Sequence, residues 1–401
     1  MRAPAVLRPL AHRDFALLWS GQTFSTIGNF VAQVAFPWQV LQLTGSAVQV
    51  GIVIAISIAT NVVFLLFGGV LVDRLPRRRV LLVSDFISGV VTAAVALLGA
   101  TGALRIEHLY VASAIGGAVG AFFLPAFTAI LPELVPQDVL VAGNALRGFS
   151  RQAGRLSGPV LGGLLIAASG PSLAFAFDAL TFFVSFLALV AMSRTQGLMS
   201  ARRAFLAEMR EGVAFVFSVP WIWVTIALFG VINTFLVGAL TVGFPFMLRE
   251  VLAVDATTFG LMYASQGVGE IAGGLLVGQL RIHRTGIAMY AFAAIGGVAM
   301  LLLAAQQLVA IVVAAVLYGL SIVIFGVLWE TSLQRHVPGA LLGRVSSVDW
   351  FGSIALAPLG PLVAGALIVA IGPAPLFVTA GLIELAGCAV ALLVPSIRRL
   401  E

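Results

Sequence analysis

Long runs of apolar residues, separated by short polar or Pro/Gly-containing breaks, follow one another along the whole chain. The runs are continuous, as in Leu376–Val394, and lack the apolar–polar alternation of an outer-membrane β-strand. Because about 20 apolar residues cross a bilayer as an α-helix, the pattern predicts an all-α polytopic membrane protein. Twelve transmembrane helices are predicted, at Leu17–Leu41, Val48–Val72, Val80–Ala100, Leu109–Leu131, Val141–Ala168, Leu173–Met192, Ile222–Met247, Phe259–Leu280, Ile287–Ala304, Leu308–Trp329, Val345–Ile371 and Leu376–Val394.

A polar interval divides these runs into six and six. The division predicts an N-terminal six-helix bundle (1–193), a cytoplasmic linker (194–220) and a C-terminal six-helix bundle (221–401). The two halves are weakly alike, since Gly158-Pro159 in the fifth run recurs as Gly360-Pro361 in the eleventh. We therefore expect two pseudo-symmetric bundles, an arrangement in which transporters bind substrate between the halves and alternate access to it.

The linker has the pattern of a helix that lies on a membrane surface. Phe205, Met209, Val213 and Val216 recur at helical spacing, and charged residues occupy the other positions. Such a segment buries its apolar side in the interfacial region of the bilayer. We interpret it as a structural connection between the bundles, with a regulatory or partner-binding role as the alternative.

The composition excludes an ordinary soluble protein. Of the 401 residues, 61% are hydrophobic and only 9% are charged, whereas soluble domains have about 45–50% and about 25%. The single cysteine, Cys388, excludes a disulfide framework. Neither a nucleotide-binding fingerprint, a catalytic constellation nor metal-ligand spacing is found, so we expect no enzyme activity, no cofactor and no metal.

The basic residues indicate how the chain is oriented. All 22 are arginines, and with both termini inside, 17 fall in cytoplasmic segments, two in outside loops and three in the fifth run. Cytoplasmic loops of membrane proteins are enriched in basic residues. The net charge of +6 therefore indicates topology rather than nucleic-acid binding, and both termini are predicted to be cytoplasmic.

The loop after the second run carries a recognisable motif. Gly69 permits close helix approach, and Asp73 can accept hydrogen bonds from a helix end or pair with a cation across the bundle interface. Such a latch would favour one access state, although a basic loop is also what the charge rule alone predicts. The motif comprises Gly69, Asp73, Arg74, Arg77 and Arg78.

This loop resembles the G-x-x-x-D-R-x-G-R-[KR] signature of the major facilitator superfamily, with Pro76 where the family usually has Gly. The resemblance implies the major facilitator fold and a cytoplasmic gate at this loop. Asp349, near the cytoplasmic end of the eleventh run, is assigned to the same gate.

The fifth run contains a second motif, Gly154, Gly158, Pro159, Gly162 and Gly163. Three of its glycines recur every four residues and form a smooth stripe for helix packing, while the proline frees a backbone carbonyl. The segment resembles the G-x-x-x-G-P-x-x-G-G element of exporter branches of the superfamily. It favours export over nutrient import.

Further resemblance extends over almost the whole chain. Arg13–Gln22, Phe122–Pro125 and Gln334–Pro338 are similar to the macrolide-efflux and enterobactin-exporter branch. That branch implies a proton-coupled antiporter of hydrophobic or amphipathic small molecules such as drugs, acting in the bacterial inner membrane. The expected partners are the substrate, protons and the bilayer, with the proton gradient as energy source and a monomeric chain. A dedicated siderophore or metabolite exporter is the alternative.

Three arginines lie on one face of the fifth run. Arg147, Arg151 and Arg155 would together cost roughly 8–10 kcal/mol if they faced lipid. They are expected to face a water-filled cavity or carboxylates, with Asp85 and Asp178 as candidates. A structural ion pair and the binding of a substrate anion are both consistent with this pattern.

Glu270 lies in the eighth run and is expected near the midplane of the bilayer. A carboxyl group in apolar surroundings retains its proton more readily than one in water. We interpret Glu270 as a proton carrier, with a structural pair as the alternative. Glu384 is equally deep, but the family resemblance makes the last run peripheral.

The first run contributes a polar stripe at positions i, i+4, i+7 and i+11, which share one side of a helix. We expect it to line a substrate cavity, although such side chains can also hold helices together. Phe123, Phe127, Asn233 and Thr234 would complete the cavity. The stripe consists of Gln22, Thr26, Asn29 and Gln33.

Overall fold

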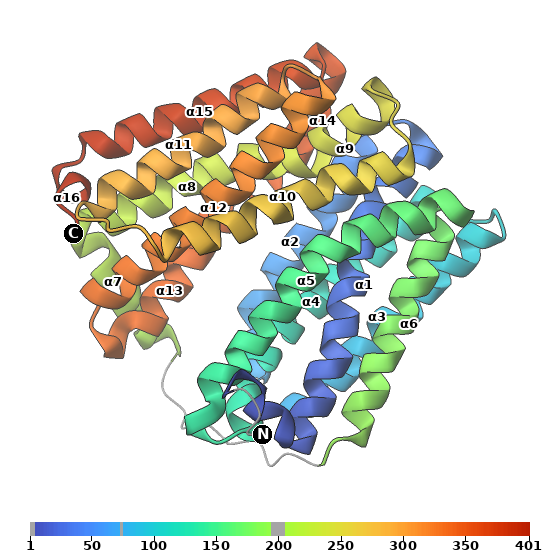
Figure 1. Ribbon diagram of the computed structural model, residues 1–401, viewed down its shortest axis with the longest axis horizontal. Helices are drawn as coiled ribbons and strands as arrows, with labels where there is room; N and C mark the ends of the chain where they lie inside the picture. The colour runs from blue at the N-terminus through green and yellow to red at the C-terminus, as the bar shows by residue number, and fades with distance from the viewer. Residues whose placement is uncertain (1–4, 73–74, 194–204) are drawn as a thin grey trace. The chain divides into compact units, whose positions relative to one another are not determined.

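The computed structural model describes residues 5–72, 75–193 and 205–401. These residues form helices joined by short turns, and no strand occurs among them (Figure 1). Within the described residues, nine helices are long and apolar enough to cross a membrane. They are Ala47–Leu65, Arg77–Ala100, Ile106–Leu134, Pro171–Ala191, Pro220–Val251, Thr285–Leu303, Leu308–His336, Leu341–Ile371 and Pro373–Leu393.

The helices of the N-terminal part cover the first six predicted runs. A short 3-10 helix, η1 (Ala5–Ala11), precedes them. The six are α1 (Arg13–Thr44), α2 (Ala47–Val72), α3 (Arg77–Ala100), α4 (Ile106–Leu134), α5 (Gln137–Ser169) and α6 (Pro171–Ala191).

The C-terminal part covers the other six. Its elements are α7 (Phe205–Ser218), α8 (Pro220–Gly238), η2 (Ala239–Gly243), α9 (Phe244–Phe246), η3 (Met247–Val251), α10 (Ala256–Val277), α11 (Thr285–Leu303), α12 (Leu308–His336), α13 (Gly339–Ile354), α14 (Leu359–Ile371), α15 (Pro373–Leu393) and α16 (Pro395–Arg398).

Two of the predicted runs are not single regular helices. The run Val345–Ile371 breaks between Ile354 and Leu359, next to Pro358, which has no amide hydrogen to donate within a helix. The run Ile222–Met247 passes from α8 into the π-helical segments η2 and η3, which flank Pro245. Apolar character continues through both irregularities, so hydropathy alone merges the pieces.

The chain divides into two compact units. The first comprises Met1–Gly45, Ile56–Ala201 and Val254–Ala264, and the second comprises Ser46–Ala55, Arg202–Ala253 and Ser265–Glu401. Each unit therefore includes a short segment from the other part of the chain: the start of α2 in the second unit and the start of α10 in the first. The predicted boundaries at 193 and 221 stay a prediction.

Glycines hold these short segments in place. A Cβ atom at Gly163 of α5 would lie 3.2 Å from the Cα atom of Gly260 of α10, in the first unit. In the second unit, a Cβ atom at Gly365 of α14 would lie 2.9 Å from the Cα atom of Val48 of α2. Backbones this close leave no room for a side chain.

The turns before α6 and α15 are also alike. Gly170 and Gly372 have φ of 80° and 83°, a conformation that a residue with a Cβ rarely adopts. A proline follows each one as the first helical residue, where its missing amide hydrogen costs nothing.

Candidate functional site

A buried polar cluster joins α1, α3 and α6 in the first unit. The Gln22 amide nitrogen donates hydrogen bonds to Asp85 Oδ2 at 3.1 Å and Ser185 Oγ at 2.8 Å. The three residues are 5%, 1% and 0% exposed. An amide can satisfy a buried carboxylate or carboxylic acid only if the helices hold both in register, so the cluster fixes how these three helices pack.

Asp178 of α6 is a second buried carboxyl group in this unit, and its side chain is 3% exposed. Its Oδ1 atom accepts no hydrogen bond from any residue in the described part of the chain. It lies opposite Gly28 of α1, where an added Cβ atom would meet Asp178 Oδ1 and the Thr181 hydroxyl. A buried acceptor without a donor is costly, so this group is a candidate for binding a proton or another ligand.

The four polar residues predicted on α1 do not share one environment. Gln22 belongs to the buried cluster, and the Thr26 hydroxyl donates to the Gln22 carbonyl oxygen at 2.7 Å. Asn29 and Gln33 are exposed on the surface of the unit. The structure therefore separates the first residue of the stripe from the last two.

The three arginines of α5 also differ from one another. The Arg147 guanidinium carbon lies 4.0 Å from the centroid of the Phe127 ring, a cation–π contact, and Arg151 is exposed. The Arg155 guanidinium carbon lies 5.6 Å from the centroid of the Phe30 ring. Phe127 in turn stacks on Phe123, with ring centroids 5.4 Å apart.

The expected carboxylate partners of these arginines lie elsewhere. Asp85 bonds to Gln22, and among the described residues neither Asp85 nor Asp178 forms an ion pair with an arginine of α5. The rings of Phe127 and Phe30 contact the guanidinium groups of Arg147 and Arg155.

The glycine stripe of α5 faces α1. A Cβ atom at Gly154 would lie 3.0 Å from Thr26 Cγ2, and one at Gly162 would lie 3.0 Å from the Val31 carbonyl oxygen. A Cβ atom at Gly158 would meet the Phe30 side chain and lie 3.1 Å from the Ile27 carbonyl oxygen. Pro159 is buried behind the stripe, and its carbonyl oxygen faces Gly260 of α10.

Glu270 is buried in the second unit, with 6% of its surface exposed. Its Oε1 atom accepts a hydrogen bond from the Gln266 amide at 3.0 Å, one turn earlier on α10. Gly319 of α12 packs against the backbone beside it, since a Cβ atom there would lie 3.0 Å from the Glu270 amide nitrogen. α12 therefore packs closely against the backbone of α10 at Glu270.

The other predicted residues of this unit bond locally. The Asn233 amide donates to the Ser353 carbonyl oxygen at 3.1 Å, and the Thr234 hydroxyl donates to the Gly230 carbonyl oxygen at 2.8 Å. Asp349 Oδ2 accepts a hydrogen bond of 2.8 Å from the Trp329 indole nitrogen. Asp349 thereby ties α13 to α12.

Only part of the predicted cytoplasmic gate is described. Gly69 lies in α2, whereas Asp73 and Arg74 are outside the described residues. Arg77 forms an ion pair with Glu133 and donates to the Ala129 carbonyl oxygen at 3.0 Å. These contacts fasten the start of α3 to the end of α4.

Arg78 fastens the start of α3 to a second helix end. Its Nε and Nη2 atoms each donate at 2.8 Å, to the carbonyl oxygens of Leu189 and Val190 in the last turn of α6. An arginine satisfies carbonyl groups that a helix end leaves without donors.

Glu384 of α15, which the family resemblance places in a peripheral helix, is a further buried carboxyl group of the second unit. It is 3% exposed, and its Oε2 atom has no hydrogen-bond partner among the described residues. A Cβ atom at Gly296 of α11 would lie 2.7 Å from Glu384 Oε1 and 3.0 Å from the Ser321 hydroxyl. The sequence does point to this residue, because a carboxyl group in the apolar run of α15 is as unusual as Glu270 in the run of α10.

Long apolar helices, two helical units and buried carboxyl groups define a polytopic membrane transporter. A family model described as "Transmembrane secretion effector" matches residues 4–357. The chain belongs to this family of the major facilitator superfamily, whose members are transporters and not enzymes.

Two curated relatives are similar over most of their length. The multidrug efflux pump Tap of Mycolicibacterium fortuitum is 29% identical, over 98% of this chain and 97% of the relative. The enterobactin exporter EntS of Shigella boydii serotype 18 is 25% identical, over 88% of this chain and 86% of the relative. These relatives support a membrane exporter of small molecules.

Solved structures agree on the fold. A bacterial homologue of the iron transporter ferroportin in an inward-facing state has a TM-score of 0.74 at 14% identity, covering 94% of this chain and 98% of that one. The nucleoside transporter NupG has a TM-score of 0.76 at 11% identity, covering 95% and 98%. At these identities the similarity indicates the transporter fold alone.

Proposed function

We propose that this protein is a proton-coupled antiporter that exports hydrophobic or amphipathic small molecules from the bacterial cytoplasm. In this proposal twelve helices cross the inner membrane with both termini in the cytoplasm, and the chain acts as a monomer without a cofactor. The proton gradient supplies the energy.

The observation that carries the proposal is a structural repeat. Gly158 of α5 packs against α1, and Gly360 of α14, which lies 202 residues later in the chain, packs against α8. At the same offset, Gly163 contacts the start of α10 and Gly365 contacts the start of α2. Two structural repeats of this kind are typical of transporters that alternate access to a substrate site, and this supports the proposal.

The proposed count of twelve membrane helices is supported by the lengths of the described helices. Nine helices meet the hydropathy and length expected of a membrane span, and α1, α5 and α10 are the remaining long helices that overlap predicted runs. These three carry the polar stripe, the three arginines and Glu270. Polar side chains lower the hydropathy of a helix that lines a transport path, so this shortfall supports a functional role for all three.

Glu270 is proposed as the proton carrier. Its side chain is buried and accepts a hydrogen bond from Gln266, a neutral amide that can bond to either the charged or the neutral carboxyl group. Asp178 and Asp85, buried in the first unit, are proposed to contribute to the same coupling. The substrate cavity is proposed to include Asn29 and Gln33, which the unit leaves exposed.

The test uses purified protein in liposomes with an imposed pH gradient and a fluorescent dye as substrate. Glu270→Gln should abolish dye transport driven by the pH gradient while leaving counterflow exchange of dye largely intact. Glu107→Gln, at an exposed position in the first turn of α4, is the matched control and should retain both activities. Unchanged gradient-driven transport in Glu270→Gln would remove this residue from the mechanism.

A dedicated siderophore exporter is the second candidate, because one relative is an enterobactin exporter and α5 carries three arginines. Replacing Arg151 and Arg155 with Gln separates the two. Loss of transport for an anionic substrate with retention for a cationic dye would favour anion recognition. Equal effects on both substrates would favour the broader exporter.

A further inference from the structure

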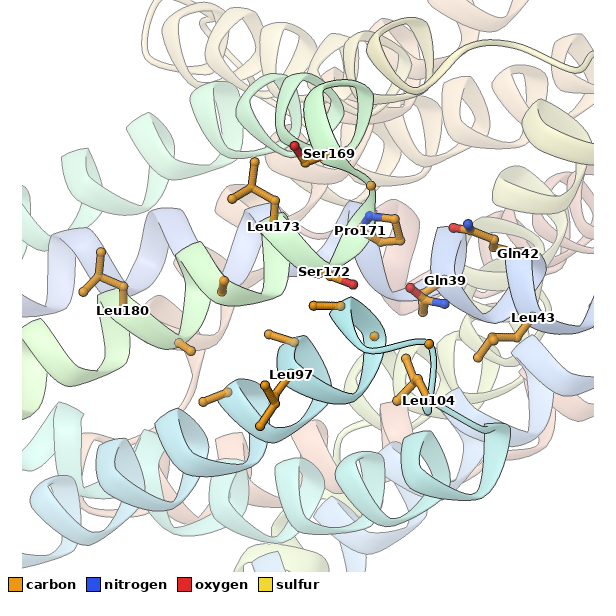
Figure 2. Close-up of a pocket in the computed structure, with 18 of the residues that line it drawn as sticks. Gln39, Gln42, Leu43, Leu97, Leu104, Ser169, Pro171, Ser172, Leu173 and Leu180 are labelled. Atoms are coloured by element: carbon orange, nitrogen blue, oxygen red, sulfur yellow. The ribbon is translucent and has the colours of Figure 1, made fainter.

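The first unit contains a cavity of about 1030 Å³ between α1, α3 and α6. Figure 2 shows Gln39 and Gln42 entering from α1, Leu97 from α3, and Ser172 and Leu180 from α6. Ligand pockets in proteins have volumes of about 300–1,000 Å³, so this one is large enough for a lipid-sized molecule. None of the residues assigned to the substrate path lines it.

The lining has an apolar wall and one polar end, and no charged side chain. Leucine, alanine and phenylalanine side chains form the wall, whereas glutamine and serine side chains gather near the last turn of α1 and the first turn of α6. Without a counter-ion, the lining would not compensate for the desolvation of a charged group. An uncharged amphipathic molecule, with its oxygen-bearing part at the polar end, matches this distribution.

Gln39 is the polar side chain of the cavity that is best placed to bind a ligand. It is 5% exposed, and it belongs to the lining of the cavity. Its side chain lines the cavity, near Ser172 (Figure 2). Because the amide faces the open cavity, it can donate hydrogen bonds to a molecule bound there and accept hydrogen bonds from it.

The depth of the polar end matches the layers of a bilayer. Gln39 lies five residues before the end of α1, about 7.5 Å along the helix axis. The wall continues deeper along Leu97 and Leu180, which are 66% and 59% exposed. Exposed leucines on membrane-spanning helices face acyl chains, so the cavity opens toward lipid.

We infer that this cavity binds a phospholipid of the surrounding bilayer. One acyl chain lies along Leu97 and Leu180, and an ester carbonyl oxygen accepts a hydrogen bond from the Gln39 amide. The charged headgroup remains outside the uncharged lining, in water. This binding site belongs to the first unit alone and does not require that the protein exports a substrate.

The test is photolabelling of the full-length protein in liposomes of phosphatidylethanolamine and phosphatidylglycerol. The probe is a phospholipid with a diazirine in one acyl chain, and labelled peptides are mapped by mass spectrometry. Peptides from 93–104 and 172–183 should be labelled several-fold more strongly than the α15 peptide that carries Leu382 and Leu393, which are exposed in the second unit. Equal labelling of all three would mean ordinary contact with bulk lipid and would overturn the inference.

Two variants test the site itself. Ala176→Phe fills the cavity from α6 and should reduce labelling several-fold, whereas Leu187→Phe, at an exposed position of the same helix outside the cavity, should not. Gln39→Met keeps the side-chain length but removes the amide. The unchanged protein should be labelled more strongly by ester-linked than by ether-linked probes. Gln39→Met should abolish this preference.

Three further outcomes would contradict the inference. They are full labelling in Ala176→Phe, no preference for ester-linked probes in the unchanged protein, and loss of labelling when rhodamine 6G, a cationic dye, is added instead of unlabelled phospholipid. The last result would assign the cavity to a transported substrate. Because labelling needs no pH gradient, these outcomes are distinguishable from failure of the proposed antiport.

Discussion

The packing of α5 against α1 gives the sharpest prediction, at two glycines of the same helix. A Cβ atom at Gly158 would meet the Phe30 side chain and lie 3.1 Å from the carbonyl oxygen of Ile27 and from the carbonyl carbon of Phe30. A Cβ atom at Gly148 would meet nothing within 4 Å. Gly158→Ala and Gly148→Ala therefore make the same chemical change in a tight and in an open site.

The expected difference can be estimated from these contacts. Both substitutions gain about 0.5–1 kcal/mol because alanine is the better helix former. Only Gly158→Ala also forces α1 and α5 apart, and overpacking of this kind costs about 1–3 kcal/mol. Because backbone atoms form two of the three contacts at Gly158, rotation of a side chain cannot relieve them. Gly158→Ala should be the less stable variant by the overpacking cost.

Thermal unfolding of the purified protein in one detergent measures this difference. For domains of about 150–250 residues, 1 kcal/mol changes Tm by about 2–4 °C, so the two variants should differ by roughly 2–12 °C. Gly148→Ala should have a Tm at or above that of the unchanged protein. Equal Tm values for the two variants would refute the idea that the glycine stripe exists for close packing with α1.

Two more predictions concern helix ends. Arg77→Ala leaves Glu133 buried without its cation and should cost roughly 3–5 kcal/mol, while the double variant with Glu133→Ala should regain part of it; equal thermal stability of the two would contradict this. Asp255→Ala removes the cap of α10, in which the Thr258 amide donates to Asp255 Oδ1 at 2.9 Å, and should cost about 0.5–2 kcal/mol at neutral pH. The hydrogen bond from the Thr258 backbone holds the pKa of Asp255 below its ordinary 3.8, so this contribution is present above about pH 4 and is lost as the pH falls through the lowered pKa. Asp255→Asn should keep most of the cap without this pH dependence, and a Tm–pH curve for Asp255→Asn that parallels that of the unchanged protein would refute the assignment.

The helices could be predicted because membrane spans are specified mainly by local composition. Apolar runs bounded by Gly-Pro turns at Gly170 and Gly372 define where α6 and α15 begin, without any knowledge of neighbours. The interruption of the eleventh run was not predicted, although Pro358 is visible in the sequence. A hydropathy average does not register the loss of one amide hydrogen in an apolar segment.

Which side chains meet across helices could not be predicted in the same way. Periodicity placed Gln22, Thr26, Asn29 and Gln33 on one side of α1, but a side of a long helix can touch more than one neighbour. The rotation and crossing of α1 against α3 and α6 decide that Gln22 meets Asp85. That rotation depends on the small residues at the helix contacts, and it can be known only once all three helices are in place.

Comparison of residues 202 positions apart shows which features the two halves share and which differ between them. In the first unit, Arg147 of α5 lies over the ring of Phe127 of α4. An offset of 202 residues leads from Arg147 to Asp349 and from Phe127 to Trp329. In that pair the Trp329 indole nitrogen donates a hydrogen bond to the Asp349 carboxylate. Each unit thus pairs a charged residue with an aromatic ring at matching positions, but with opposite charge and different chemistry. The packing glycines at 158 and 360 are common to both halves, so the scaffold repeats while the charge does not. An asymmetric function on a symmetric scaffold must therefore be sought in such pairs, where the two halves differ at positions that the packing makes equivalent.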